Sequence, residues 1–363
     1  MGCKEKQVPL FENIATEDTG VSFANLVKNT EQLNIITFRN FYNGGGVSIG
    51  DVNNDGLMDI YFTSNMADNK LYLNEGDFKF KDISTSSGTG GSKAWTNGTT
   101  FADINQDGFL DIYVCHSGVL QNTSAKNELF INQGDGTFIE SAGQYGLADS
   151  GFGTQAAFLD FDLDGDLDCY ILNNSLENPD KLNLYASSRE TKDSLGGDRF
   201  YENREGFYHD ITDKAGIYSS KIGFGLGVSV GYLNEDNYPD IYVSNDFWEK
   251  DYLYLNTGKG SFKESLNDKV ETLSLNSMGG DIGDINNDGH FDLINTDMLP
   301  ANNDRLKRMT AFDSPQAFEN KKKQGYHHQL LQNSLQLNDG AGGFQEVANM
   351  TGLAATDWSW GAL

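Results

Sequence analysis

Apolar and polar residues alternate in short runs along most of this chain, and Gly, Asn and Asp separate the runs. The run at 59–62 reads Asp-Ile-Tyr-Phe, and similar runs return at 111–114, 168–171, 240–243 and 292–294. An apolar spacing of two predicts β-strands, whereas a helix would repeat its apolar positions every three or four residues. The chain is therefore expected to be an all-β protein.

A polar turn of the form Asp-x-Asx-x-Asp-Gly-x-x-Asp precedes these runs. Complete copies begin at Asp51, Asp103, Asp160 and Asp284, and a degenerate copy begins at Tyr232. Subtracting successive start positions gives intervals of 52, 57, 72 and 52 residues. The two shortest intervals define the repeating unit, and the longer ones indicate insertions.

A second repeated segment follows each turn, with apolar alternation around a tip of Asn, Gly and Asp. Its copies lie at 71–78, 129–138, 200–207, 253–262 and 335–344. This pattern predicts a β-hairpin. Each unit then holds four strands, one on either side of the turn and two in the hairpin. Four short strands with a period near fifty residues predict the blade of a β-propeller.

The two ends of the chain look like partial units. Residues 11–20 resemble the outer strand at 207–216, and 358–363 resembles the run at 95–101 that enters a polar turn. We therefore expect about five complete four-stranded blades plus partial ones.

The expected organisation is a tether followed by one propeller domain that is truncated at its C-terminus. The tether covers 1–10 and the domain covers 11–363, with insertions at 174–197 and 299–330. Propellers commonly close by pairing an N-terminal outer strand with C-terminal inner strands, so the natural protein is expected to be longer.

The polar turns have the chemistry of a calcium loop. Oxygen-bearing side chains at positions 1, 3 and 5, Gly at position 6 and a backbone carbonyl at position 7 converge on one point, and Ca²⁺ takes about six to eight oxygens. Position 12 is Phe62, Val114, Ile171 or Asn295 instead of the Glu of an EF-hand. A metal-free polar turn is the alternative for a single copy. Four copies in register favour the metal, because clustered carboxylates repel one another without a cation.

The predicted ligands occupy positions 1, 3, 5, 7 and 9, and position 7 contributes its backbone carbonyl. They are Asp51, Asn53, Asp55, Leu57 and Asp59; Asp103, Asn105, Asp107, Phe109 and Asp111; Asp160, Asp162, Asp164, Asp166 and Asp168; and Asp284, Asn286, Asp288, His290 and Asp292. The degenerate copy keeps Asn234, Asp236 and Asp240, but Tyr232 replaces the first Asp and Asn237 replaces Gly. We expect about four Ca²⁺ sites and a weak or empty fifth.

These turns resemble the FG-GAP repeats of integrin α-subunit propellers and of VCBS-repeat proteins. The segments 42–46, 245–247 and 357–361 resemble bacterial surface proteins related to cartilage acidic protein, which often carry an ASPIC/UnbV-type domain. The resemblance covers 11–363. It implies seven blades in the intact protein, calcium ligation by the four complete turns, and an adhesive or ligand-binding role.

The charge of the chain narrows the choice of partners. There are 53 Asp and Glu against 26 Lys and Arg, for a net charge of −27. So acidic a surface repels phosphates, which excludes a nucleic-acid partner. The expected partner is an extracellular glycan or protein.

An enzymatic role is the alternative hypothesis, as a propeller hydrolase or lyase acting on polysaccharide. Asp246 and Glu249 would be its carboxylate pair, with Phe247 and Trp248 nearby to stack on a sugar. No Ser-His-Asp order, phosphate-binding loop or cofactor motif is found in the sequence. No catalytic residue is therefore assigned, and a binding module is the favoured interpretation.

The cysteines bear on location. Cys115 and Cys169 lie in apolar runs and are expected to be buried hydrophobic residues, without a disulfide framework. Met1-Gly2-Cys3 resembles the start of a mature bacterial lipoprotein, which predicts lipidation of Cys3 and an outer-membrane or cell-surface location. Lys6 argues against N-myristoylation. No apolar stretch is long enough to span a membrane.

Two other segments carry candidate chemistry. The insertion at 299–330 concentrates basic residues in a helix-compatible stretch, and it either packs over one face of the propeller or contacts an acidic ligand. These residues are Arg305, Lys307, Arg308, Lys321, Lys322 and Lys323. His327 and His328 are adjacent, so on a strand they would point to opposite faces and form no joint site.

Overall fold

The computed structural model describes residues 11–92, 95–117, 125–178, 186–234, 236–310 and 314–362. In those ranges, five four-stranded antiparallel sheets follow one another along the chain. Each sheet is a meander in which strands that are successive in the sequence are hydrogen-bonded neighbours, except that β20 intervenes between β19 and β21. The fold is thus mostly β, and its four-stranded sheets are propeller blades, as the repeat predicts.

The blades are built from the following strands. They are β1 (Val47–Gly50), β2 (Asp59–Phe62), β3 (Lys70–Asn74) and β4 (Phe80–Asp82); β5 (Thr96–Ala102), β6 (Asp111–His116), β7 (Glu128–Asn132) and β8 (Phe138–Glu140); β9 (Gly153–Leu159), β10 (Asp168–Asn173), β11 (Arg199–Arg204) and β12 (Phe207–Asp210); β13 (Gly225–Gly231), β14 (Asp240–Asn245), β15 (Tyr252–Asn256) and β16 (Phe262–Glu264); and β18 (Gly279–Gly283), β19 (Asp292–Thr296), β21 (Ser334–Asn338) and β22 (Phe344–Glu346). A separate parallel pair joins β17 (Leu273–Ser274) to β20 (Gln329–Leu330).

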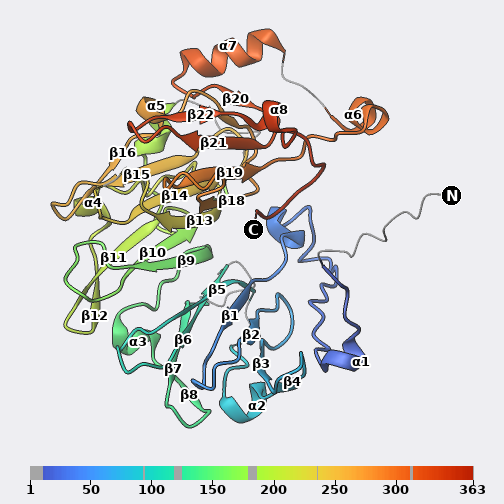
Figure 1. Ribbon diagram of the computed structural model, residues 1–363, viewed down its shortest axis with the longest axis vertical. Helices are drawn as coiled ribbons and strands as arrows, with labels where there is room; N and C mark the ends of the chain where they lie inside the picture. Colours follow the sequence, from blue (N-terminus) through green and yellow to red (C-terminus); the bar gives the residue numbers. More distant parts are fainter. Residues whose placement is uncertain are drawn as a thin grey trace.

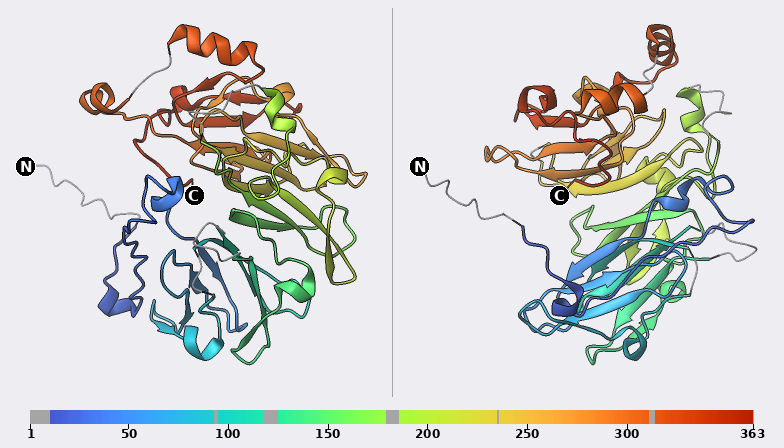
Figure 2. Two further views of the ribbon diagram at one scale, coloured as in Figure 1. Left: turned by 180° about the vertical axis from the view of Figure 1, so that it is seen from behind. Right: turned by 90° about the vertical axis from the view of Figure 1, so that its right-hand side faces the viewer.

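The helices are short, and most of them lie between strands in the sequence. They are α1 (Thr16–Thr19), η1 (Arg39–Tyr42), α2 (Ser84–Ser87), α3 (Ala142–Tyr145), η3 (Ala186–Glu190), α4 (Thr212–Ala215), α5 (Leu266–Lys269), α6 (Asn303–Met309), α7 (Pro315–Lys323) and α8 (Ala348–Thr351). None of the helices in the described ranges is long and apolar enough to cross a membrane. The two longest, α6 and α7, lie in the predicted insertion at 299–330 and stand at the periphery beside the fifth blade (Figure 2).

The first strands of successive blades lie side by side, and the blades fan out from them in sequence order (Figure 1). Side chains join these inner strands to one another. Thr100 Oγ1 on β5 donates to the carbonyl oxygen of Ala156 on β9 at 2.7 Å, and Ser229 Oγ on β13 donates to that of Gly280 on β18 at 3.0 Å. The sheets therefore face one another around a common axis.

The core lies between the faces of adjacent blades. Every residue of β6, β10 and β14 is buried, because each of these strands is covered on both faces by a neighbouring sheet. Between the third and fourth blades, the Phe200 ring packs edge-on against Phe161 and Phe262, with ring centroids 5.0 and 5.2 Å apart. Aromatic pairs of this kind add to the free energy gained by burial of their area.

The expectation of a strand at 11–20 is wrong. Residues 16–19 form α1, which ends at Gly20 with φ of 77°, and Phe11 is 86% exposed. The helical turn does match its counterpart at 212–216, because each is followed by a Gly in the left-handed conformation. Gly20 packs closely on the outer strand of the first blade, since a Cβ on it would lie 2.6 Å from the Phe80 carbonyl oxygen of β4. Within the described ranges, residues 11–15 belong to none of the sheets.

The segment at 358–362 is also not a strand. Trp358 and Trp360 are 52% and 48% exposed, whereas Trp95, which precedes β5, is 1% exposed. The backbone nonetheless lies against the fifth blade, where a Cβ on Gly279 would be 2.8 Å from the Trp360 carbonyl oxygen. Without a second strand to accept its hydrogen bonds, the run does not become β-structure.

The segment 21–46 crosses from the first blade to the third and fourth. Its Phe41 is buried against Trp95, which precedes β5, and the two ring centroids lie 5.4 Å apart. The Arg39 guanidinium donates to the carbonyl oxygen of Ser175 at 2.6 Å and lies between the rings of Phe224 and Phe247, 4.8 and 4.9 Å from their centroids. One arginine thus fixes the N-terminal segment to two distant blades.

Candidate metal centre

All four complete polar turns connect the first and second strands of a blade and share one backbone conformation. In the first turn, Asn54 has φ of 60° and Gly56 has φ of 86°. The degenerate turn reaches the same left-handed conformation with Asn237, at φ of 64°. Gly and Asn tolerate this region best, so the residue types at position 6 follow from the turn geometry.

The Asp at position 1 organises the turn. Asp51 Oδ1 accepts the N–H of Asp55 at 3.1 Å, and Asp51 Oδ2 accepts the N–H of Gly56 at 2.7 Å. The same two bonds recur at Asp103, Asp160 and Asp284. Tyr232 cannot accept them and is 50% exposed, so the degenerate turn lacks this anchor.

The Asp at position 9 is a buried clamp. Asp59 has no exposed surface, and its two oxygens accept the N–H groups of Val52 at 2.9 Å and Asn74 at 2.8 Å. The equivalent pairs of bonds are made by Asp111, Asp168, Asp240 and Asp292. Position 9 therefore joins the turn to the third strand of its blade.

Burial makes the clamping carboxylates of Asp111, Asp168 and Asp240 hard to ionise. It raises the pKa of Asp111 to about 6 and the pKa of Asp168 and Asp240 to about 7, although two backbone N–H groups act in the opposite direction on each. Other carboxylates of the same turn add to the rise in Asp111 and Asp168. A cation in the turn would favour the ionised form of each.

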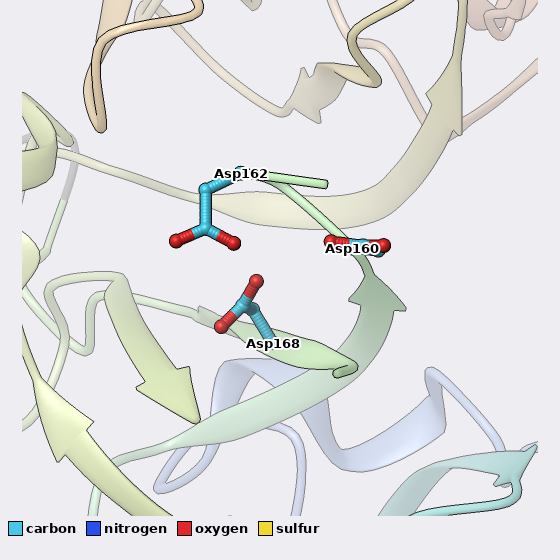
Figure 3. A group of neighbouring side chains, drawn as sticks. All are labelled: Asp160, Asp162 and Asp168. Atoms are coloured by element: carbon cyan, nitrogen blue, oxygen red, sulfur yellow. The ribbon is translucent and has the colours of Figure 1, made fainter. Parts of the chain in front are cut away.

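The third turn gathers the most negative charge. Asp160, Asp162 and Asp168 each place a carboxylate oxygen within 4.8 Å of the others, and Figure 3 shows the carboxylates of Asp162 and Asp168 facing each other. Burial and the charge of Asp164 raise the pKa of Asp162. A set of donors made only of oxygen suits a hard cation such as Ca²⁺, and the buried Asp residues are typical of calcium sites in such turns.

The other complete turns have Asn at position 3, and its amide bonds to position 5. Asn53 Nδ2 donates to Asp55 Oδ2 at 3.0 Å, and the same bond is made by Asn105 and Asn286. This bond holds two of the predicted ligands of each turn together.

The residues at position 7 present their backbone toward position 5. The N–H of Leu57 donates to Asp55 Oδ1 at 2.8 Å, and the N–H groups of Phe109, Asp166 and His290 make the same bond. In the degenerate turn, Asn234 Nδ2 still donates to Asp236 Oδ2 at 2.9 Å. That turn thus keeps its position 3, 5 and 9 contacts and loses only the anchor at position 1.

The carboxylates considered for catalysis do not form an open pair. Glu249 is 1% exposed and accepts two hydrogen bonds from the Arg189 guanidinium. Asp246 accepts the N–H of Phe247 at 2.7 Å. The ring of Trp248 lies beneath Lys321 Nζ, 4.2 Å from its centroid, so it offers no free stacking face there.

The other candidate residues either make contacts that stabilise the fold or lie outside the described ranges. His327 Nε2 lies 2.7 Å from the Val270 carbonyl oxygen and His328 Nδ1 lies 3.3 Å from that of Glu271, so their contacts are separate. Cys115 and Cys169 are buried, as expected, and burial raises the pKa of both thiols. Cys3 lies outside the described ranges.

The basic residues of the insertion are largely paired. Arg305 bonds Asp357 at 2.5 Å, Arg308 lies 3.1 Å from Asp304, and Lys322 lies 3.5 Å from Glu319. Lys321 is only 6% exposed.

One functional position was missed by sequence reasoning. In the second, fourth and fifth blades, the Asn that ends the third strand donates its N–H to the position 9 Asp and its side-chain amide to the preceding blade. Asn132 Nδ2 bonds the Val52 carbonyl oxygen at 2.8 Å, and Asn256 Nδ2 bonds that of Phe161 at 2.7 Å. Its signal was the invariant Asn of the hairpin segment, which the pattern assigned only to a turn.

Comparisons with known proteins agree with this repeat. The family model for the FG-GAP-like repeat matches residues 51–114, 119–171 and 232–294, which together contain all five turns. Cartilage acidic protein 1 of Xenopus tropicalis is 26% identical over 230 residues, which cover 62% of this chain and 32% of that protein. The chain thus spans about a third of the length of this relative.

Two solved structures match this chain at low similarity. The biofilm matrix protein Bap1 of V. cholerae is 14% identical with a TM-score of 0.41, over 84% of this chain and 39% of that one. The Tc holotoxin pore of Photorhabdus luminescens is 14% identical with a TM-score of 0.35, over 83% of this chain and 12% of that one. On the matched repeats and their shared turn geometry, the chain is an FG-GAP-like repeat protein and a distant homologue of cartilage acidic protein 1.

Proposed function

We propose that this chain is a calcium-stabilised extracellular binding module of a bacterial surface lipoprotein, and that it recognises a glycan or a protein. The observation that carries the calcium part is the convergence of Asp160, Asp162 and Asp168 within 4.8 Å, in a turn whose architecture recurs in four blades. Such a set of carboxylates repels itself unless a cation or protons neutralise it.

Each complete turn would hold the cation through its side chains at positions 1, 3, 5 and 9 and the carbonyl at position 7. When bound, Ca²⁺ would neutralise these carboxylates and favour the ionised form of the buried Asp at position 9. Because positions 1 and 9 flank the turn between the first two strands of a blade, binding would stabilise the inner part of each sheet. The degenerate turn is proposed to bind weakly, since it has no carboxylate at position 1.

A binding role fits the surface better than catalysis does. A groove of about 1160 Å³ runs between α5 and the hairpin of β21 and β22. Its lining is rich in amides, carboxylates and imidazoles, including Asn267, Glu271, His328 and Asn349. Side chains of these types hydrogen-bond sugar hydroxyls and polar peptides alike. Among the described residues, Asp246 and Glu249 are engaged as above, which leaves the polysaccharide-cleaving alternative without its carboxylate pair.

The surface location rests on the sequence Met1-Gly2-Cys3, which we propose to be lipidated at Cys3. Mass spectrometry of the mature protein from its own membranes would detect this, as a diacyl or triacyl adduct on the N-terminal peptide.

Ligand capture tests the binding role. The protein is probed on a glycan array and against cell-surface extracts, once with calcium and once with chelator. We expect a retained glycan or protein that is lost on chelation and returns when calcium is restored. Retention of no ligand in calcium, or the appearance of cleaved glycan products, would contradict the proposal.

A further inference from the structure

Hydrogen bonds connect the polar turns of neighbouring blades. Asn54, at position 4 of the first turn, donates its Nδ2 to the Gly108 carbonyl oxygen in the second turn at 2.9 Å. Gln106, at position 4 of the second turn, donates its Nε2 to the Gly165 carbonyl oxygen at 2.7 Å and to Asp166 Oδ1 at 2.8 Å in the third turn. The first three turns therefore form a connected row.

The two bonds to carbonyl oxygens act on peptide groups that adjoin a predicted ligand. The Gly108 carbonyl belongs to the same peptide as the Phe109 N–H, which donates to Asp107 Oδ1 at 2.9 Å. This peptide is thus held on one side by Asn54 of the first turn and on the other by a predicted ligand of its own turn. Ordering either turn restrains this peptide and so helps to order the other.

A second link runs through the interior. Asn132 donates its N–H to Asp111 Oδ1 and its Nδ2 to the Val52 carbonyl oxygen, both at 2.8 Å. The N–H of Val52 donates in turn to Asp59 Oδ2 at 2.9 Å. A chain of hydrogen bonds through Asn132 and Val52 therefore connects the buried carboxylate of Asp111 to that of Asp59.

We propose that the calcium turns of the first three blades are energetically coupled, so that occupancy of one raises the calcium affinity of the next. This inference rests on the proposed calcium function and describes how the same sites are regulated. By linkage, the effect is equal in both directions between two turns. The surface links end at the third turn, because position 4 there is Leu163, which has no donor. The turn at 284–292 is connected to that row only through the interior bonds of Asn256 and Asn338, so we expect its coupling to the row to be weaker.

The chain supplies its own substitutions for a test. Leu163 occupies position 4 with φ of 61°, so Leu is accepted in this left-handed conformation. Asn54→Leu and Gln106→Leu together remove the surface links and leave all predicted ligands in place. Asn287→Leu is the matched control, because Asn287 has the same left-handed conformation, with φ of 58°, and donates no hydrogen bond to a neighbouring turn in the described ranges.

Calorimetric calcium titration of the chelator-treated chain measures the coupling. We expect the double variant to keep the calcium stoichiometry of the wild type, with a less steep isotherm and an affinity about threefold lower for each lost contact. Asn287→Leu should leave the isotherm unchanged. Hydrogen exchange without calcium gives a second readout, in which Asn54→Leu should speed exchange of the peptide covering 103–111.

The outcomes separate this inference from the proposed function. A double variant with the same isotherm and the same exchange as the wild type overturns the coupling and leaves the calcium sites standing. An equal loss of affinity in Asn287→Leu also overturns it, since the effect would then be local to each turn. A wild-type chain that binds no calcium overturns the proposed function and the coupling together.

Discussion

Asp198 accepts a 2.6 Å hydrogen bond from the hydroxyl of Tyr170, at a place where the second blade uses an asparagine. Its other oxygen accepts the N–H of Asn173 at 2.9 Å. In the second blade, Asn127 Oδ1 accepts the N–H of His116 at 2.8 Å and Asn127 Nδ2 donates to the Tyr113 hydroxyl at 3.1 Å. The neutral amide of Asn127 thus connects the second and third strands of its blade in the way that the carboxylate of Asp198 does in the third blade.

Asp198→Asn should stabilise the protein above neutral pH. Burial raises the pKa of Asp198 to about 7, so the folded state holds this proton more tightly than the unfolded chain, whose pKa is about 4. The contribution of this group to stability is therefore full below pH 4 and lost as pH rises to 7. At pH 8 the variant should gain about 1–4 kcal/mol over the wild type, with little difference at pH 4.

Urea denaturation of both proteins at several pH values checks this, because the difference between them cancels the titration of all other groups. A variant that is less stable than the wild type at pH 8 would show that the ionised carboxylate is the stabilising form.

Removal of calcium should lower the melting temperature by many degrees. A ligand that binds only the folded state stabilises it by about 2.7 kcal/mol per site at a concentration one hundred times its Kd. The emptied turns would also retain carboxylates that repel one another. Calorimetric melting with calcium and with chelator measures the shift, and magnesium serves as the control ion. Superimposable curves in all three conditions would contradict the stabilising role.

The turn at 160–168 should bind calcium most tightly, because it alone has four Asp side chains at positions 1, 3, 5 and 9. Asp162→Asn gives it the composition of the other complete turns and should weaken it about tenfold, or about 1.4 kcal/mol. Asn105→Asp is the reciprocal change and should strengthen the second turn. If the tightest calcium step is unaffected by Asp162→Asn, charge count does not set the order of affinities.

Arg39→Met should destabilise the fold by about 2–4 kcal/mol, because it removes a half-buried guanidinium that donates hydrogen bonds and lies between two aromatic rings. The guanidinium connects the N-terminal segment to Ser175 and Glu177, and its charge lowers the pKa of Asp246, which burial raises to about 6. Arg308→Met is the control.

Arg308 and Asp304 form an exposed pair within α6, worth at most about 1 kcal/mol. Equal urea midpoints for the wild type and Arg39→Met would show that this arginine does not hold the blades together.

The blades were predictable because the residue patterns that specify strands and turns are local and recur in every unit. The alternation around β2 and the hairpin tip after β3 recur in each copy, so the four-stranded sheet follows from the sequence. The left-handed positions of the turn were also predictable, since Gly56 and its equivalents are the residues that such a turn prefers.

Hydrogen bonds and packing contacts between units were not predictable from the repeat pattern. Asn132 and Asn256 occupy a hairpin end by sequence, and only the packing of neighbouring blades brings the carbonyls of Val52 and Phe161 to their amides. The strand predicted at 11–20 was wrong for a related reason, because a segment with a strand-like sequence forms a β-strand only when it pairs with another strand. Phe38 and Phe41 have no periodic spacing, so their burial near Trp95 gave no signal.

The number of calcium ions bound at equilibrium tests the central claim most directly. The chelator-treated chain is titrated with calcium, with magnesium at the same concentrations as the control, and bound metal is counted by calorimetry and by elemental analysis after dialysis. Four complete turns predict about four calcium ions per chain, with a weak fifth step at most from the turn at 232–240. A stoichiometry of zero or one would contradict the account of these turns as calcium sites.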